Sequence, residues 1–165
     1  MRVFFSFHYS DDIFRAMVVR NSGALEGITE FGFIYRADFE EIEKQGTQAV
    51  ARWIDQQLVE ASVTVVLIGT HTLECPYVQY AIAQSTKMGY SIIGVQIHGI
   101  KDTVTKKTSY PGDIFNCSIP INESLYSFKD VAFSTHDFVR NNGHDNLGHW
   151  IKQPELAKLN RSPFS

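Results

Sequence analysis

Several side chains that could bind a ligand stand in short segments where strands are predicted to end: Ser6, His8, Arg36, Asp38 and Tyr77. They offer hydroxyl groups, an imidazole, a charge pair and an aromatic face. Such a set suits a ligand that carries ribose, phosphate and a flat ring. Each residue also has an ordinary alternative role, which is a backbone hydrogen bond for the serine, packing for the histidine and a solvated pair for Arg36 and Asp38.

No motif of known mechanism completes this set. The chain lacks the G-x-G-x-x-G and G-x-x-x-x-G-K-[ST] phosphate loops, the H-E-x-x-H zinc motif and the G-x-S-x-G serine motif. The two cysteines, Cys75 and Cys117, match neither a metal-ligand spacing nor a disulfide framework. We therefore expect reduced, inert thiols, no metal site and a polar crevice whose reaction the residue types alone do not specify.

The composition limits the class of protein. With 165 residues, 44% of them hydrophobic and 20% charged, the chain is expected to form a single globular domain over residues 1–165. The net charge is −3 and no basic run is longer than Lys106-Lys107, so nucleic acid is not an expected partner. No apolar stretch approaches the roughly 18 residues of a membrane span, and the N-terminus lacks signal-peptide features, so we expect a cytoplasmic protein.

Four apolar, β-branched segments predict the strands that must position the candidate residues: Val3–Phe7, Phe31–Tyr35, Ser62–Gly69 and Ser91–Ile97. Apolar residues at helical spacing predict three helices, which begin at Ile13, span Ala49 to Leu58, and run from Pro76 to the residues before Gly89. We also expect a final helix at Asp145–Leu159, interrupted by Pro154. Strands that alternate with helices predict an α/β fold with a central parallel sheet flanked by helices. The pattern between residues 101 and 135 predicts no element.

Ligands of open parallel sheets bind beyond the carboxyl ends of the strands, where helix N-termini also point. This rule nominates the segments that follow the predicted strands: Ser6–Asp12, Tyr35–Phe39, Gly69–Tyr77 and His98-Gly99. The candidate side chains lie in the first three. We therefore expect the site at that edge of the sheet.

Two segments carry a resemblance to a known family. VFFSFHYSDD resembles the first box of TIR domains, and VVLIGTHTLECPYVQYAIAQS is similar to the TIR segment in which an aromatic residue precedes a glutamate by four positions. Tyr77 takes the aromatic place, and Ala81 the place of the glutamate. Together with IIGVQIHGIKD, these segments resemble the TIR-like proteins of the bacterial Thoeris anti-phage system.

The resemblance implies a flavodoxin-like TIR fold and an enzyme that cleaves the nicotinamide–ribose bond of NAD. NAD would be the substrate, no separate cofactor would be needed, and the ADP-ribose part would become a diffusible nucleotide that activates an effector protein. The product could be cyclised ADP-ribose, an ADP-ribose conjugate or plain ADP-ribose. The implied substrate contacts are Ser6, Phe7, His8, Arg36, Asp38 and Tyr77. TIR-like domains commonly self-associate, so a homodimer is a further expectation.

Ala81 changes what the resemblance implies for this chain. A carboxylate can stabilise the oxocarbenium-like ribose of the transition state, whereas an alanine methyl cannot. Glu74 lies in an upstream loop and is not expected to substitute, because catalytic geometry tolerates little displacement. The chain is then either a deliberately inactivated variant or a natural member that binds NAD. The alternative functions are a TIR scaffold module without chemistry and a flavodoxin-like nucleotide sensor.

Overall fold

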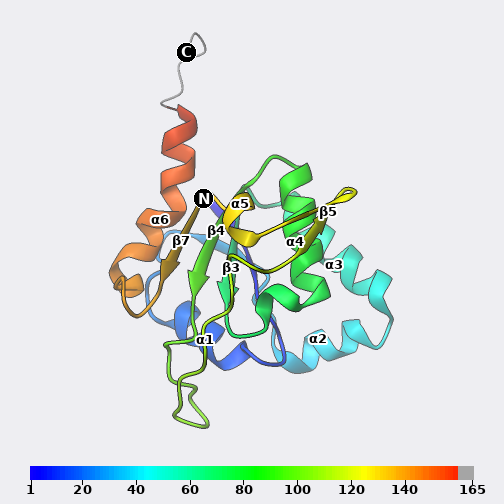
Figure 1. Cartoon of the computed structure of the whole chain (residues 1–165). Coiled ribbons are helices and arrows are strands. Elements are labelled where there is room, and N and C mark those ends of the chain that lie inside the picture. Colours follow the sequence, from blue (N-terminus) through cyan, green and yellow to red (C-terminus); the bar gives the residue numbers. More distant parts are fainter. Residues whose placement is uncertain (160–165) are drawn as a thin grey trace.

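The computed structural model describes residues 1–159, in which strands and helices alternate as predicted (Figure 1). The main sheet has the order β2-β1-β3-β4-β7 and is formed by β1 (Arg2–Ser6), β2 (Thr29–Phe31), β3 (Val63–Ile68), β4 (Ser91–Gln96) and β7 (Ser134–Asp137). All neighbouring strands pair in parallel. The predicted parallel sheet in a flavodoxin-like α/β arrangement is confirmed.

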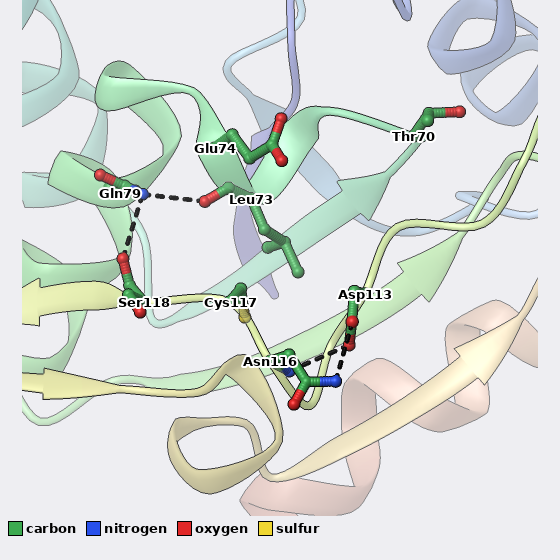
Figure 2. A pocket seen from close by; sticks show the side chains of 8 residues that line it. All are labelled: Thr70, Leu73, Glu74, Gln79, Asp113, Asn116, Cys117 and Ser118. Atoms are coloured by element: carbon green, nitrogen blue, oxygen red, sulfur yellow. Dashed lines mark hydrogen bonds between the residues drawn. The ribbon is translucent and has the colours of Figure 1, made fainter.

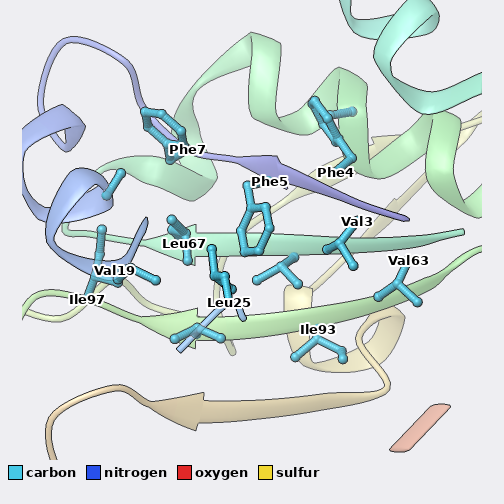
Figure 3. Packing of buried hydrophobic residues seen from close by; sticks show 14 of the residues in the cluster. Val3, Phe4, Phe5, Phe7, Val19, Leu25, Val63, Leu67, Ile93 and Ile97 are labelled. Atoms are coloured by element: carbon cyan, nitrogen blue, oxygen red, sulfur yellow. The ribbon is translucent and has the colours of Figure 1, made fainter. Parts of the chain in front are cut away.

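Helices cover both faces of this sheet: α1 (Ile13–Asn21), α2 (Arg36–Glu43), α3 (Thr47–Val59), α4 (Pro76–Lys87), α5 (Phe128–Val131) and α6 (Gly143–Leu159). Successive strand residues point to opposite faces. Leu67 packs in the same cluster as Val19 of α1 (Figure 3), and Ile151 of α6 belongs to that cluster too. Val66, on the opposite face of β3, packs with Ile82 of α4. Within residues 1–159, no helix combines the length and the apolar character that a membrane crossing requires.

The second strand and the final helix differ from their predicted forms. The strand ends at Phe31 and does not extend to Tyr35, because Gly32 turns the backbone at φ +90°, where a Cβ would lie 2.2 Å from the Phe5 carbonyl oxygen. The polar stretch that follows is α2. The predicted interruption at Pro154 is also wrong, since α6 continues through it. Packing of the buried preceding turn, which includes Ile151, outweighs the one hydrogen bond that proline removes.

The segment without a sequence prediction contains a small hairpin and a short helix. The hairpin pairs β5 (Ile119–Ile121) with β6 (Ser124–Tyr126) in antiparallel register, and α5 follows directly. Asn122 makes the tight turn in the left-handed region, with φ 55°. Three-residue strands, one of which contains Pro120, are too short for an alternating pattern to predict.

Candidate functional site

Two loops meet at the carboxyl edge of the sheet, one after β1 and one after β3. These strands are neighbours, with Ser6 opposite Val66, and the chain leaves them toward opposite faces of the sheet. Such a divergence is where open α/β sheets bind ligands. The loops are tied together by Thr72, whose hydroxyl donates to Asp12 Oδ2 at 2.8 Å and accepts from the Gly69 amide at 2.7 Å.

A cavity of about 200 Å³ lies on these loops, and we call it the aromatic cavity; its walls are His8, Tyr9, Ser10, Phe39, Glu43, Cys75, Pro76 and Tyr77. A second hollow of about 290 Å³, which reaches α3, shares Pro76 and Tyr77 with it. Ligand pockets commonly measure roughly 300–1,000 Å³. The aromatic cavity alone therefore fits one part of a dinucleotide, and Tyr77 lies where the two hollows meet.

Stacked rings form one wall of the aromatic cavity. Tyr9 stacks on Phe39 with 4.2 Å between ring centroids, and Phe39 meets the ring of Tyr77 edge-on at 5.9 Å. The Tyr9 hydroxyl donates to the Gly32 carbonyl at 2.9 Å, and burial raises the pKa of this phenol well above its ordinary value. The wall is therefore rigid and uncharged, which suits a flat ring.

The structure brings His8 and Tyr77 together in this cavity, although they are far apart in the sequence. His8 Nδ1 accepts from the Asp11 amide at 3.1 Å, which fixes the ring within its loop. Burial raises the pKa of Tyr77, and nearby Glu43 and Cys75 raise it further, so its hydroxyl stays protonated. Ser6 lies at the end of β1 and is 4% exposed.

Phe7 and the two charged candidates of α2 lie outside the aromatic cavity. The side chain of Phe7 is fully buried in the core, 4.3 Å from the ring of Tyr9. Arg36 and Asp38 are exposed in the first turn of α2, where Arg36 Nε donates to Glu40 Oε1 at 3.0 Å and does not pair with Asp38. The helix turns Phe39 inward instead. Ligand contacts of these three residues stay predictions.

Ala81 lies in α4, one turn after Tyr77, and is fully buried. Its carbonyl accepts from the Ser85 hydroxyl, which is also 2.7 Å from the hydroxyl of Thr64 at the start of β3. Because α4 runs back along β3, Ala81 lies closer than Ser85 to the carboxyl edge of the sheet. Helical side chains lean toward the helix N-terminus, so a longer side chain at position 81 would extend toward Tyr77 and the aromatic cavity.

Of the residues that line the aromatic cavity, only His8 and Tyr77 were predicted from the sequence as ligand contacts. Tyr9, Ser10, Cys75 and Pro76 lay in nominated segments but were not named as contacts. Phe39 closed a nominated segment but was not named as a contact, and Glu43 gave no signal because helix α2 carries it there from outside every nominated loop. Had the polar stretch been read as a helix, the four-residue spacing of Phe39 and Glu43 would have placed both side chains on one face.

A larger cavity of about 390 Å³ lies between the β3–α4 connection and the segment before β5 (Figure 2); it is lined by Thr70, Leu73, Glu74, Gln79, Asp113, Asn116, Cys117 and Ser118. Gln79 Nε2 donates to the Leu73 carbonyl, and Asn116 Nδ2 donates to Asp113 Oδ2 at 3.0 Å. The side-chain amides of Gln79 and Asn116 are thus hydrogen-bonded within the wall of this cavity. None of the predicted contact residues lines it.

The buried carboxyl group of Asp12 leads to a prediction about how the free energy of unfolding depends on pH. Asp12 is 3% exposed, and burial raises the pKa of its carboxyl group against the opposing effects of the Thr72 hydrogen bond and of His8 and Arg15. Because the pKa of this carboxyl group is higher in the folded state than in the unfolded state, its protonated form favours folding at low pH. This contribution to stability is lost as pH rises through the folded pKa. We therefore expect Asp12→Asn to exceed the parent in free energy of unfolding at neutral pH, with the difference vanishing in acid.

Urea unfolding of both proteins across acidic to neutral pH measures this effect. A variant no more stable than the parent at neutral pH would show that the buried carboxylate costs the fold nothing.

Comparison with known proteins covers the part of the chain that carries the aromatic cavity. Residues 4–102, which run from within β1 through β4 and include both crevice loops, match a family model described as "Thoeris protein ThsB, TIR-like domain". ThsB1 of Bacillus cereus (strain MSX-D12), named as a proposed cyclic ADP-D-ribose synthase, is 41% identical over 103 residues, covering 61% of this chain and 54% of the relative. The chain thus spans about half the length of that relative. Since the family model covers more than half of the chain, the chain belongs to the TIR-like domain family of the Thoeris protein ThsB.

Proposed function

We propose that this chain binds NAD in the crevice between the β1 and β3 loops and takes part in NAD-derived signalling. The Thoeris family match and the name of the B. cereus relative support this proposal. The observation that carries the proposal is the position of Tyr77 and Ala81 on successive turns of α4, with Tyr77 in the wall of the aromatic cavity. We place its action in the cytoplasm.

The aromatic cavity would take the nicotinamide end of NAD. The ring would lie against Tyr77 and Phe39, which present an uncharged aromatic wall. His8, in the wall of the cavity, would offer a polar contact to the adjoining ribose. Ser6, buried at the end of β1 and outside the cavity wall, stays a predicted contact. The scissile nicotinamide–ribose bond would then lie close to the turn of α4 that carries Ala81.

Cleavage of this bond leaves a positively charged ribose that a carboxylate stabilises. Ala81 supplies none, so the chain is proposed to bind NAD far better than it cleaves it. With a carboxylate at position 81, the site would release nicotinamide and yield an ADP-ribose-derived nucleotide that diffuses to an effector protein. The name of the B. cereus relative favours a cyclised product. A homodimer, as TIR-like domains form, is part of the proposal.

A titration with NAD tests the binding step. Tyr77→Ala should weaken NAD binding about tenfold, because an aromatic contact contributes roughly 0.5–1.5 kcal/mol beyond its buried area. Tyr77→Phe keeps the ring and should bind nearly as the parent does. Isothermal titration calorimetry measures both affinities.

Tyr126→Ala, on the separate hairpin strand β6, is the matched control and should leave the affinity unchanged. An unaltered affinity of Tyr77→Ala would remove the aromatic cavity from the proposal. Concentration-dependent assembly of the parent without any nucleotide affinity would favour a scaffold module instead.

A further inference from the structure

A second cavity lies on the same two loops as the aromatic cavity. It measures about 300 Å³ and its walls include Asp11, Asp12, Arg15, Ser109 and Tyr110; we call it the charged cavity. Residues 8–10 of the first loop line the aromatic cavity and residues 11–12 line the charged one. In the second loop, residues 75–77 line the former and residues 70–71 the latter. The two cavities therefore lie on adjacent residues of the same two loops.

Asp12 is the buried acceptor of the charged cavity. Although it stands at the N-terminus of α1, its side chain makes no capping bond there. The carboxylate packs against Gly69, where a Cβ would lie 2.2 Å from Oδ1, so glycine is what leaves room for it. One of its bonds comes from Thr72. Since a carboxylate offers about four lone-pair sites, Asp12 retains acceptor capacity.

Two further groups make the charged cavity a polar site. Arg15 is 7% exposed, and its Nε and Nη2 donate to the carbonyls of Ile100 and Lys107 at 2.8 and 3.0 Å, which holds the segment leading to Ser109 in place. The Ser109 hydroxyl is buried and has no hydrogen-bond partner among residues 1–159. Buried polar groups are nearly always paired, so this hydroxyl indicates a polar ligand.

We infer that the charged cavity holds the adenosine ribose of NAD, with a ribose hydroxyl donating to Asp12 and another accepting from Ser109. This inference rests on the proposed function, in which the aromatic cavity takes the nicotinamide end. A carboxylate that accepts from the ribose 2′-hydroxyl selects NAD over NADP, because a 2′-phosphate would meet a like charge. The crevice therefore discriminates between the two dinucleotides through Asp12, with Asp11 adding charge beside it.

Titration of the full chain with NAD and with NADP tests this inference. The parent should prefer NAD by about tenfold or more, from like-charge repulsion in a poorly solvated site. Asp12→Asn keeps an acceptor for Thr72 and should lower that preference several-fold. Ser109→Ala should weaken both dinucleotides alike, as should Tyr77→Ala. The control Asp130→Asn, an exposed carboxylate of α5, should leave the NAD-to-NADP ratio unchanged.

The outcomes separate the inference from the proposed function. If the parent binds NAD and Asp12→Asn leaves the NAD-to-NADP ratio of affinities as it was, the charged cavity is not the ribose site and NAD binding stands. If the parent binds neither dinucleotide, both fail.

Discussion

Ala81→Glu is expected to give a chain that cleaves NAD and releases nicotinamide. Position 81 lies one turn after Tyr77, and a side chain there leans toward the aromatic cavity, where the proposed function places the nicotinamide ribose. A carboxylate at that point would face the charge that develops as the bond breaks. Groups that stabilise such charge typically contribute about 10²–10³-fold in rate.

Ala81→Gln is the matched control, because the amide has the size of the carboxylate without its charge. Ala81 is fully buried, so both variants place the same bulk into the core and both should be checked for folding by circular dichroism. Nicotinamide release by Ala81→Glu should exceed nicotinamide release by Ala81→Gln by at least about 10²-fold. Mass spectrometry of the nucleotide then distinguishes cyclised ADP-ribose, a conjugate and plain ADP-ribose. A folded Ala81→Glu that binds NAD and releases no more nicotinamide than Ala81→Gln would refute the enzyme proposal.

Phe7→Ala is expected to lower the free energy of unfolding by about 3–5 kcal/mol, the range measured for buried phenylalanines. The side chain is fully buried and contacts the rings of Tyr9 and Phe33, at 4.3 and 5.8 Å between centroids. Domains of this size have total stabilities of about 5–15 kcal/mol, so the loss is large. Urea unfolding measures it.

Phe7→Leu separates packing from ligand contact. It retains most of the buried volume and should cost less than Phe7→Ala, with NAD affinity close to that of the parent. A stable Phe7→Leu with much weaker NAD affinity would show that the ring itself contacts the ligand, as the family resemblance implied.

The sequence predicted the parts of the fold that follow from local pattern. The run Ser62–Gly69 is nearly all apolar or β-branched, as expected of a strand covered on both faces, and β3 is buried along its whole length. The end of β2 could not be predicted in this way. It depends on the approach of Gly32 to the carbonyl of Phe5, a contact that exists only once the strands are paired.

The sequence predicted the loops that carry the candidate cavity better than the residues that line it. The rule for strand ends nominated the two loops that meet, and His8 and Tyr77 were identified from them. The bond between Asp12 and Thr72 joins residues 60 positions apart, and no local pattern signals it. Asp12 stands at the N-terminus of α1, yet its side chain points to the neighbouring loop because Gly69 leaves space there.

The most direct test of the central claim is a titration of NAD into the unchanged chain, with nicotinamide measured in the same samples. We expect saturable binding of NAD with the dinucleotide left intact, since His8 and Tyr77 line the aromatic cavity and Ala81 provides no carboxylate. Absence of binding, or rapid nicotinamide release by the unchanged chain, would contradict this account.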